Sequence, residues 1–201
     1  RTWLESHGVD TSAIVEIEND FCASFFVNTD QAQNQIASFY TGAMAHASRL
    51  SFAKYAADAD LAVISPNAPD AMGQYAAECR ALGIPYIYDP SEHKLIQDKT
   101  GLSEDQILQR VGRLLVTLAS EGARLIINGD EIRIPSVPPH SIIDPTGAGD
   151  AFRAGLMRGM QLGLPWEIAG RMGALAATYV LEQMGPQNHH YSPQEFVARY
   201  R

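Results

Sequence analysis

The stretch from Ile142 to Gly155 constrains the fold of this chain more than any other. It reads IIDPTGAGDAFRAG: two β-branched residues, a turn of Asp, Pro, Thr and Gly, and then a run rich in small residues. This order predicts a strand that ends at Ile143 and a helix whose first turn contains Asp150.

The expected helix start predicts an anion site. The first N–H groups of a helix lack backbone partners and lie at the positive end of its dipole, which suits a phosphate. Gly147 and Gly149 have no Cβ, so a ligand could approach the backbone closely. The Asp150 carboxylate would repel a bound phosphate, so its position favours a chemical role. It could take a proton from a hydroxyl group that attacks phosphorus.

The first half of the chain predicts a small sheet followed by a β-α-β unit. The β-α-β pattern implies a right-handed crossover between parallel strands, and hence an α/β fold. The small sheet is expected to be an antiparallel meander. Its strands are Ile14–Ile17, Cys22–Asn28 and Gln35–Tyr40, and the β-α-β unit comprises Leu61–Ile64, Pro69–Leu82 and Pro85–Tyr88.

In the second half, capping boxes predict helix starts at Ser103 and Ser192. Asn128-Gly129 predicts a hairpin between two strands. The small residues of an expected helix from Pro165 to Gln183 suggest close packing against the Asp150 helix. The expected strands are Arg113–Leu118, Ala123–Ile127 and Glu131–Ile134.

Composition narrows the class of protein. With 201 residues, 46% hydrophobic and 19% charged, the chain is typical of a globular protein with one or two domains. A net charge of −8 argues against a nucleic-acid or anionic-membrane partner. No signal peptide or long apolar run is present, and Cys22 and Cys79 fit the reduced, partly buried thiols of a cytoplasmic protein.

The segment Asp144–Gly155 resembles the C-terminal signature of the pfkB (ribokinase-like) family of sugar and nucleoside kinases. It is neither a dinucleotide fingerprint, because Phe152 stands where the third glycine would be, nor a P-loop. The resemblance implies a three-layer α/β/α fold with a largely parallel sheet, comprising a small β lid (12–40) and a kinase core (41–201). It implies that Asp150 is the catalytic base, and that Gly147, Ala148 and Gly149 form an anion hole for the γ-phosphate.

Two further segments resemble nucleotide-binding loops of the family. Val116–Gly122 is similar to its Thr-x-Gly-x-x-Gly loop, although Ala119 replaces the first glycine. Gly185–Asn188 is similar to the loop beside the adenine and a monovalent cation. The residues implied to bind nucleotide are Thr117, Gly122, Gly185, Gln187 and Asn188, and those implied to help hold the cation, such as K⁺, are Asp144 and Thr146.

Both assignments have simpler structural alternatives. The segment Val116–Gly122 is equally well a strand followed by a turn. Asp144 is equally well a turn-forming side chain bonded to its own backbone. His189 and His190 lack a third metal ligand at a sensible spacing, so we expect both at the surface.

The resemblance also implies the reaction. It is transfer of the γ-phosphoryl group of ATP, with Mg²⁺, to a primary hydroxyl group of a small molecule. Similarity of Asn34–Ile36, Phe39–Met44 and Gln187–His189 to the adenosine-kinase-like branch favours a nucleoside acceptor. A sugar kinase of the ribokinase or fructokinase type and a non-catalytic nucleotide sensor remain alternatives. Lids of related kinases sometimes pair between subunits, so a homodimer is plausible.

The chain departs from the family pattern in two places. Family members are longer and open with a β-α-β half that carries a Gly-Gly substrate motif, which this sequence lacks. The family's Asn-x-x-Glu motif, tied to Mg²⁺ and phosphate, is also missing from its expected place shortly before the helix that Leu102-Ser103 introduces. We therefore expect absent segments before Arg1 and near Lys94-Leu95, and an acceptor pocket that is incomplete.

Overall fold

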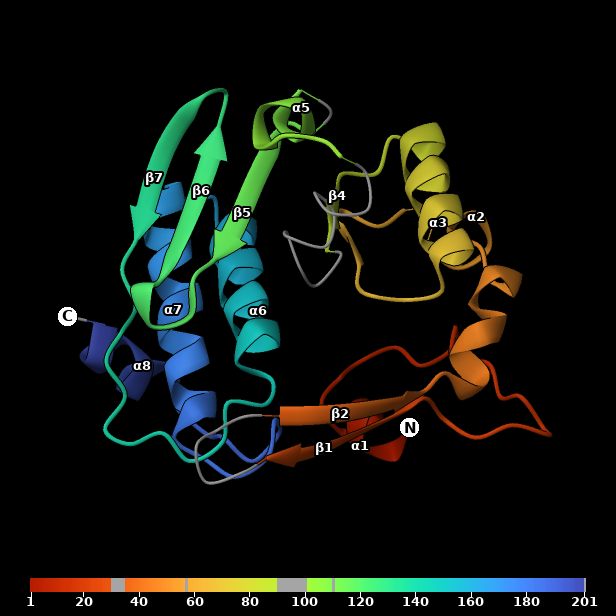
Figure 1. The fold of residues 1–201 in the computed structure, drawn as a ribbon, viewed down its shortest axis with the longest axis horizontal. Coiled ribbons are helices and arrows are strands. Elements are labelled where there is room, and N and C mark those ends of the chain that lie inside the picture. Colours follow the sequence, from red (N-terminus) through yellow and green to blue (C-terminus); the bar gives the residue numbers. More distant parts are fainter. Residues whose placement is uncertain (30–34, 57, 90–100, 110, 201) are drawn as a thin grey trace. The chain divides into compact units, whose positions relative to one another are not determined.

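The computed structural model describes residues 1–29, 35–56, 58–89, 101–109 and 111–200. The chain divides into two compact units, Arg1–Lys99 and Thr100–Arg201. Each unit combines helices with strands (Figure 1), which confirms the expected α/β class. None of the described helices has the length and apolar character needed to cross a membrane.

The segment expected to form a lid contains a two-stranded antiparallel ribbon. Strands β1 (Ser24–Thr29) and β2 (Gln35–Tyr40) pair so that Ser24 lies opposite Tyr40. The predicted third strand at Ile14–Ile17 is wrong. Local bonds use its backbone instead, because the N–H of Ile14 donates to the carbonyl of Thr11 and the Arg1 guanidinium donates to the carbonyl of Ile14.

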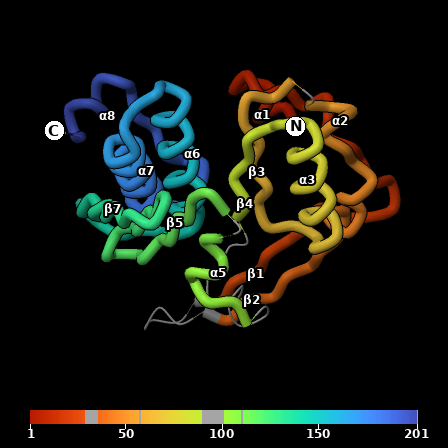
Figure 2. The backbone as a smooth tube through the Cα atoms, turned by 90° about the horizontal axis from the view of Figure 1, so that it is seen from above, coloured from red at the N-terminus to blue at the C-terminus, as the bar shows by residue number. Residues whose placement is uncertain are grey.

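The predicted β-α-β unit is confirmed. Strands β3 (Ala62–Ile64) and β4 (Tyr86–Tyr88) are parallel, and α3 (Pro69–Leu82) connects them. Figure 2 shows α3 beside these strands. Cys79 is buried in the shared core, whereas Cys22 is exposed, contrary to its expected partial burial, and both thiols are free. The other helices of this unit are α1 (Thr2–Ser6), the 3₁₀ helix η1 (Gly42–Arg49) and α2 (Phe52–Tyr55).

The sheet of the second unit is antiparallel, with the order β5-β6-β7. The predicted hairpin is confirmed, with Asn128 and Gly129 both at positive φ. The predicted capping box at Ser103 is also confirmed, and its helix ends at Leu108. The elements are α5 (Glu104–Leu108), β5 (Arg113–Thr117), the 3₁₀ helix η2 (Ala119–Glu121), β6 (Ala123–Ile127) and β7 (Asp130–Ile134).

The share of parallel pairing is smaller than expected. Among the described residues only β3 and β4 pair in parallel, and the other ladders are antiparallel. The reason is the short connections of the second unit, since a turn of a few residues can join only antiparallel strands.

Helices α6 (Ala148–Gln161) and α7 (Trp166–Leu181) pack closely, as their small residues predicted. A Cβ at Gly155 would lie 2.6 Å from the carbonyl oxygen of Met172, and one at Gly159 would lie 2.5 Å from the Cβ of Ala169. The helices run antiparallel, so α6 begins at the end of the pair where α7 stops (Figure 1). Helix α8 (Pro193–Tyr200) follows with its predicted capping box at Ser192.

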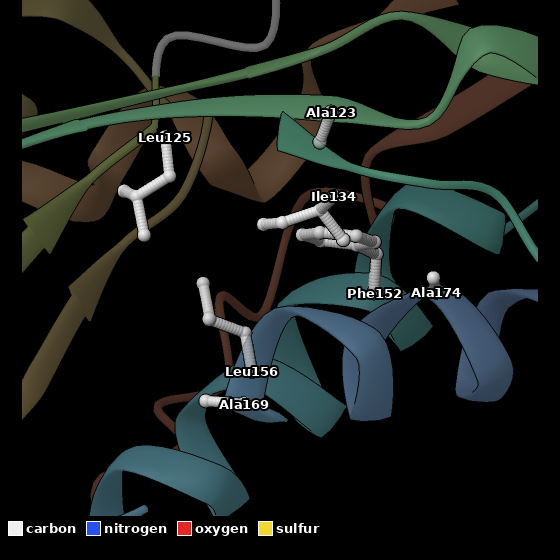
Figure 3. Packing of buried hydrophobic residues seen from close by; sticks show 7 residues of the cluster. All are labelled: Ala123, Leu125, Ile134, Phe152, Leu156, Ala169 and Ala174. Atoms are coloured by element: carbon white, nitrogen blue, oxygen red, sulfur yellow. The ribbon is translucent and has the colours of Figure 1, made fainter. Parts of the chain in front are cut away.

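The core of the second unit fixes α6 against the sheet. Leu125 and Ile134 point from the strands toward Phe152 and Leu156 of α6 (Figure 3). Gly170 of α7 permits this packing, because a Cβ there would lie 2.3 Å from the Cδ1 atom of Ile134. The start of α6 therefore projects from a packed support.

Candidate active site

The turn that leads into α6, residues 140–147, is attached to a helix end. We call it the Asp144 turn. The predicted strand at Ile142-Ile143 is wrong: neither residue is in a strand, and they are 70% and 50% exposed. The N–H groups of Ile143 and Asp144 both donate to the carbonyl of Leu181, at 2.8 and 3.3 Å. The last carbonyls of a helix lack intrahelical partners, so the end of α7 replaces the expected neighbouring strand.

Asp144 links this turn to the loop after α7. Its Oδ1 atom accepts from the N–H of Thr146 and its Oδ2 atom accepts from the N–H of Gly185, both at 2.9 Å. The pKa of Asp144 is lowered because the Thr146 hydroxyl, the Thr146 N–H and the Gly185 N–H all donate to the carboxylate. The turn-forming interpretation of Asp144 is thus confirmed, and the same side chain holds two loops together.

Gly147 and Gly149 have different roles in the geometry. Gly147 has a φ of +87°, and a Cβ there would lie 2.6 Å from the Cβ of Pro186. The backbone conformation and the contact with Pro186 both require glycine at this position. A Cβ at Gly149 would meet only the Nη1 atom of Arg153, at 3.7 Å. Gly149 therefore borders the open space that a ligand needs.

The three predicted anion-hole residues differ in their free amides. The N–H of Ala148 donates to the carbonyl of Pro145 at 3.2 Å, so it is already engaged in the turn. Within the described part of the chain, no backbone partner accepts from the N–H of Gly147, Gly149 or Asp150. Sequence reasoning missed the amide of Asp150 itself, although the third position of a helix carries such a group.

Asp150 lies in the first turn of α6 with a side chain that is 79% exposed. It forms an ion pair with Arg153, one turn further along the helix. The guanidinium balances the carboxylate charge, which reduces the repulsion that a phosphate would feel here. Sequence reasoning missed Arg153, although its spacing of three residues from Asp150 was a usable signal.

The loop after β5 adopts the backbone of a glycine-rich loop. Ala119 has a φ of +50°, in the region that glycine favours. Gly122 has a φ of +89°, and a Cβ there would lie 2.1 Å from the carbonyl oxygen of Ile134. The segment is a strand followed by a turn, with Thr117 exposed at the end of β5. Among the described residues, no backbone hydrogen bond links this loop to the Asp144 turn.

The loop after α7 lies against the Asp144 turn through Gly185 and Pro186. Gln187 and Asn188 are exposed there, and the Asn188 amide donates to the carbonyl of Met184 at 2.7 Å. The structure thus joins two of the predicted segments, Asp144–Gly149 and Gly185–Asn188, at one end of the α6–α7 pair.

His189 is only partly at the surface. His190 is exposed as expected, but His189 is half-buried with its ring 6.0 Å from that of Tyr191. Burial lowers the pKa of His189, and the charge of His190 lowers it further. No group of three or more His, Cys, Asp or Glu side chains that could hold a metal ion occurs among the residues that the structure describes.

Comparison with known proteins agrees with these features. Residues 102–193 match the family model described as pfkB family carbohydrate kinase. A nucleoside kinase of Methanothermobacter thermautotrophicus is 27% identical over 240 residues, an alignment that covers 100% of this chain and 73% of that protein. The alignment is longer than this chain, so part of the relative has no counterpart here. The proposed gap near Lys94-Leu95 itself lies outside the described residues.

Solved structures of kinases are also similar to this chain. The structure of Burkholderia thailandensis nucleoside kinase in complex with inosine has a TM-score of 0.92 and 30% sequence identity, and the match covers 99% of this chain and 74% of that one. Arabidopsis thaliana ribokinase complexed with ribose and ATP is similar in fold alone, with a TM-score of 0.74 and 20% identity over 96% of this chain and 74% of that one.

Proposed function

Since the chain belongs to the pfkB, or ribokinase-like, family and is a phosphotransferase that acts on an alcohol group, we propose that it phosphorylates a nucleoside at a primary hydroxyl group with ATP as donor. The observation that carries the proposal is the start of α6, where the exposed Asp150 carboxylate stands beside unbonded backbone amides. The similarity of the chain to a nucleoside kinase whose structure was solved in complex with inosine favours a nucleoside over a free sugar as acceptor.

Asp150 is the proposed general base. Phosphoryl transfer needs a group that accepts the proton of the attacking hydroxyl group and holds that group in line with the phosphorus. Oδ1 of the exposed Asp150 carboxylate accepts from Arg153, so Oδ2 is the oxygen proposed to accept this proton. Its ion pair with Arg153 orients it from the side of the helix. The pair also limits repulsion between the carboxylate and the transferred group.

The amides at the start of α6 are the proposed anion hole. Those of Gly147, Gly149 and Asp150 are the better donors, because the amide of Ala148 already donates within the turn. Fixed backbone dipoles aimed at a developing charge stabilise a transition state without any cost of reorganisation. Helix α6 supplies such fixed dipoles, because the core of the second unit holds it against the sheet.

The nucleotide is proposed to lie along the loops that carry Thr117, Gly122, Gly185, Gln187 and Asn188. Gln187 and Asn188 are exposed, and Asp144 holds Gly185 near the start of α6. Any contact between this loop and adenine would therefore lie at a fixed position relative to the proposed anion hole. At the other loop, the positive φ values at Ala119 and Gly122 give the backbone a tight turn.

The metal ions differ in how they fit this chain. The described residues contain no acidic cluster that would hold Mg²⁺ by itself, so we treat Mg²⁺ as part of the ATP substrate, where it bridges phosphate oxygens. Asp144 fits a K⁺ ion in part. Its carboxylate is kept ionised, but amides from two loops already donate to both oxygens. No step of the proposed mechanism depends on K⁺.

A homodimer through the lid is also proposed. Exposed apolar side chains lie on both faces of the β1–β2 ribbon, and exposed apolar surface can mark an interaction site. They are Phe25, Phe26, Ile36 and Phe39, which are 54–77% exposed.

The free thiols of Cys22 and Cys79 agree with a cytoplasmic location.

A coupled assay of ADP release tests the proposed function. Inosine, adenosine, ribose and fructose are each supplied with Mg-ATP, and we expect turnover with a nucleoside. Turnover with ribose or fructose alone would instead favour a sugar kinase, which the family description and the ribokinase-like fold keep as second candidate. Binding of ATP without phosphorylation of any acceptor would favour a nucleotide sensor.

A further inference from the structure

A carboxylate and a guanidinium form a fork at the end of α7. Glu182 is the first residue beyond that helix, and Arg199 comes from α8. Nη1 of Arg199 donates to Oε2 of Glu182 at 2.7 Å, and Nη2 donates to Oε1 at 2.6 Å. The side chain of Glu182 is only 12% exposed and that of Arg199 only 19%. Arg199 also lies over the ring of Tyr179, at 4.8 Å. Both partners are therefore held in one orientation.

The fork also reaches the Asp144 turn. Oε1 of Glu182 accepts from the N–H of His140, the first residue of that turn, at 2.6 Å. The next point of attachment is the carbonyl of Leu181, adjacent to Glu182, which accepts from the N–H groups of Ile143 and Asp144. Two consecutive residues at the end of α7 thus hold three amides of the turn.

These bonds attach the turn that leads to the proposed anion hole. The Asp144 turn is not part of any strand in the described chain, so no ladder of hydrogen bonds fixes it. Its far end is Gly147, the residue at which α6 begins. Movement of the turn would be transmitted to the unbonded amides of Gly147 and Gly149.

We propose that Glu182 and Arg199 are positioning residues for phosphoryl transfer, which hold the Asp144 turn so that the amides at the start of α6 point at the transferred group. This inference rests on the proposed kinase function. Arg199 acts through Glu182, and Glu182 acts through the backbone of the turn. Neither residue needs to touch a substrate.

A second ion-pair network in the same unit provides a matched control. Arg124 donates to Glu131 at 2.9 Å and to Glu104 at 3.0 Å, and its side chain is 25% exposed. None of these bonds reaches the Asp144 turn. Loss of Arg124 therefore removes a comparable set of charged hydrogen bonds without releasing the turn.

The experiment compares Arg199→Ala, Arg199→Lys and Arg124→Ala in the full chain. A small misplacement of catalytic groups can cost up to about 10²-fold in rate, so we expect Arg199→Ala to lower kcat about tenfold with KM for ATP and nucleoside little changed. Arg199→Lys keeps the charge but loses the fork, so its kcat should fall between that of Arg199→Ala and that of the wild type. Added guanidinium at millimolar concentration should restore kcat of Arg199→Ala only, whereas Arg124→Ala should keep wild-type kcat.

Hydrogen exchange gives a readout that does not need activity. The amides of Ile143 and Asp144 should exchange faster in Arg199→Ala than in Arg124→Ala. Equal exchange in both variants, or a wild-type kcat for Arg199→Ala, would overturn the inference. If the wild type phosphorylates no acceptor but the two variants show the predicted difference in exchange, the proposed function is overturned and the anchoring role of the pair is kept.

Discussion

Gly147 and Gly149 have the same letter in the signature but different physical reasons to be glycine. At Gly147 a side chain would meet both a left-handed backbone and the ring of Pro186. At Gly149 the backbone is helical and the neighbourhood is open. The sequence shows two glycines in a turn, but it cannot show Pro186, because that contact comes from a residue 39 positions further along the chain.

This difference predicts that two matched substitutions affect different properties, stability at Gly147 and activity at Gly149. Gly147→Ala should lower the free energy of unfolding by about 2–5 kcal/mol, because a left-handed alanine costs about 1–2 kcal/mol and overpacking costs about 1–3 kcal/mol. Gly149→Ala should leave the free energy of unfolding within about 1 kcal/mol, since alanine favours helix there, but it should lower kcat by crowding the anion site. Urea denaturation and kinetics measure both. Equal destabilisation by the two changes would contradict the assignment.

At the scale of elements, helix caps and turns could be predicted from local sequence signals, whereas the partners of strands distant in the sequence could not. The capping boxes at Ser103 and Ser192 and the hairpin at Asn128-Gly129 depend on bonds within a few residues. The strands expected at Ile14–Ile17 and Ile142-Ile143 failed because β-branched residues favour an extended backbone but cannot supply a pairing strand. In the second case the end of α7 takes that place.

The junction of α7 and α8 predicts a pH dependence of stability. The donors Arg199 and His140 lower the pKa of Glu182 to about 2 from its ordinary value of 4.5. A lowered folded-state pKa adds stability above the unfolded-state pKa, and that stability is lost as the pH falls from about 4.5 to about 2. Urea denaturation between pH 6 and about 3 should therefore show a smaller acid-induced loss in Glu182→Gln than in the wild type. Identical pH profiles would exclude this role of the carboxylate.

At the scale of the whole molecule, we propose that the chain contains the phosphoryl-transfer half of its family's site. The signature Asp144–Gly155 predicted the base and the anion hole, and the pfkB resemblance is confirmed by the comparisons. The support of that site could not be predicted, because Pro186, Glu182 and Arg199 approach it only through tertiary packing. The nucleoside acceptor was favoured by weak similarities, and the relatives now support it.

The account depends most on Asp150 as the base, and the variant Asp150→Asn tests it directly. Loss of a general base is worth about 10²–10⁴-fold, so kcat for nucleoside phosphorylation should fall by that factor. Binding of ATP and the free energy of unfolding should change little, because the side chain is 79% exposed. Asp70→Asn, an exposed acid in the first turn of α3, is the control and should keep full activity. An Asp150→Asn enzyme with near wild-type kcat would contradict the central claim.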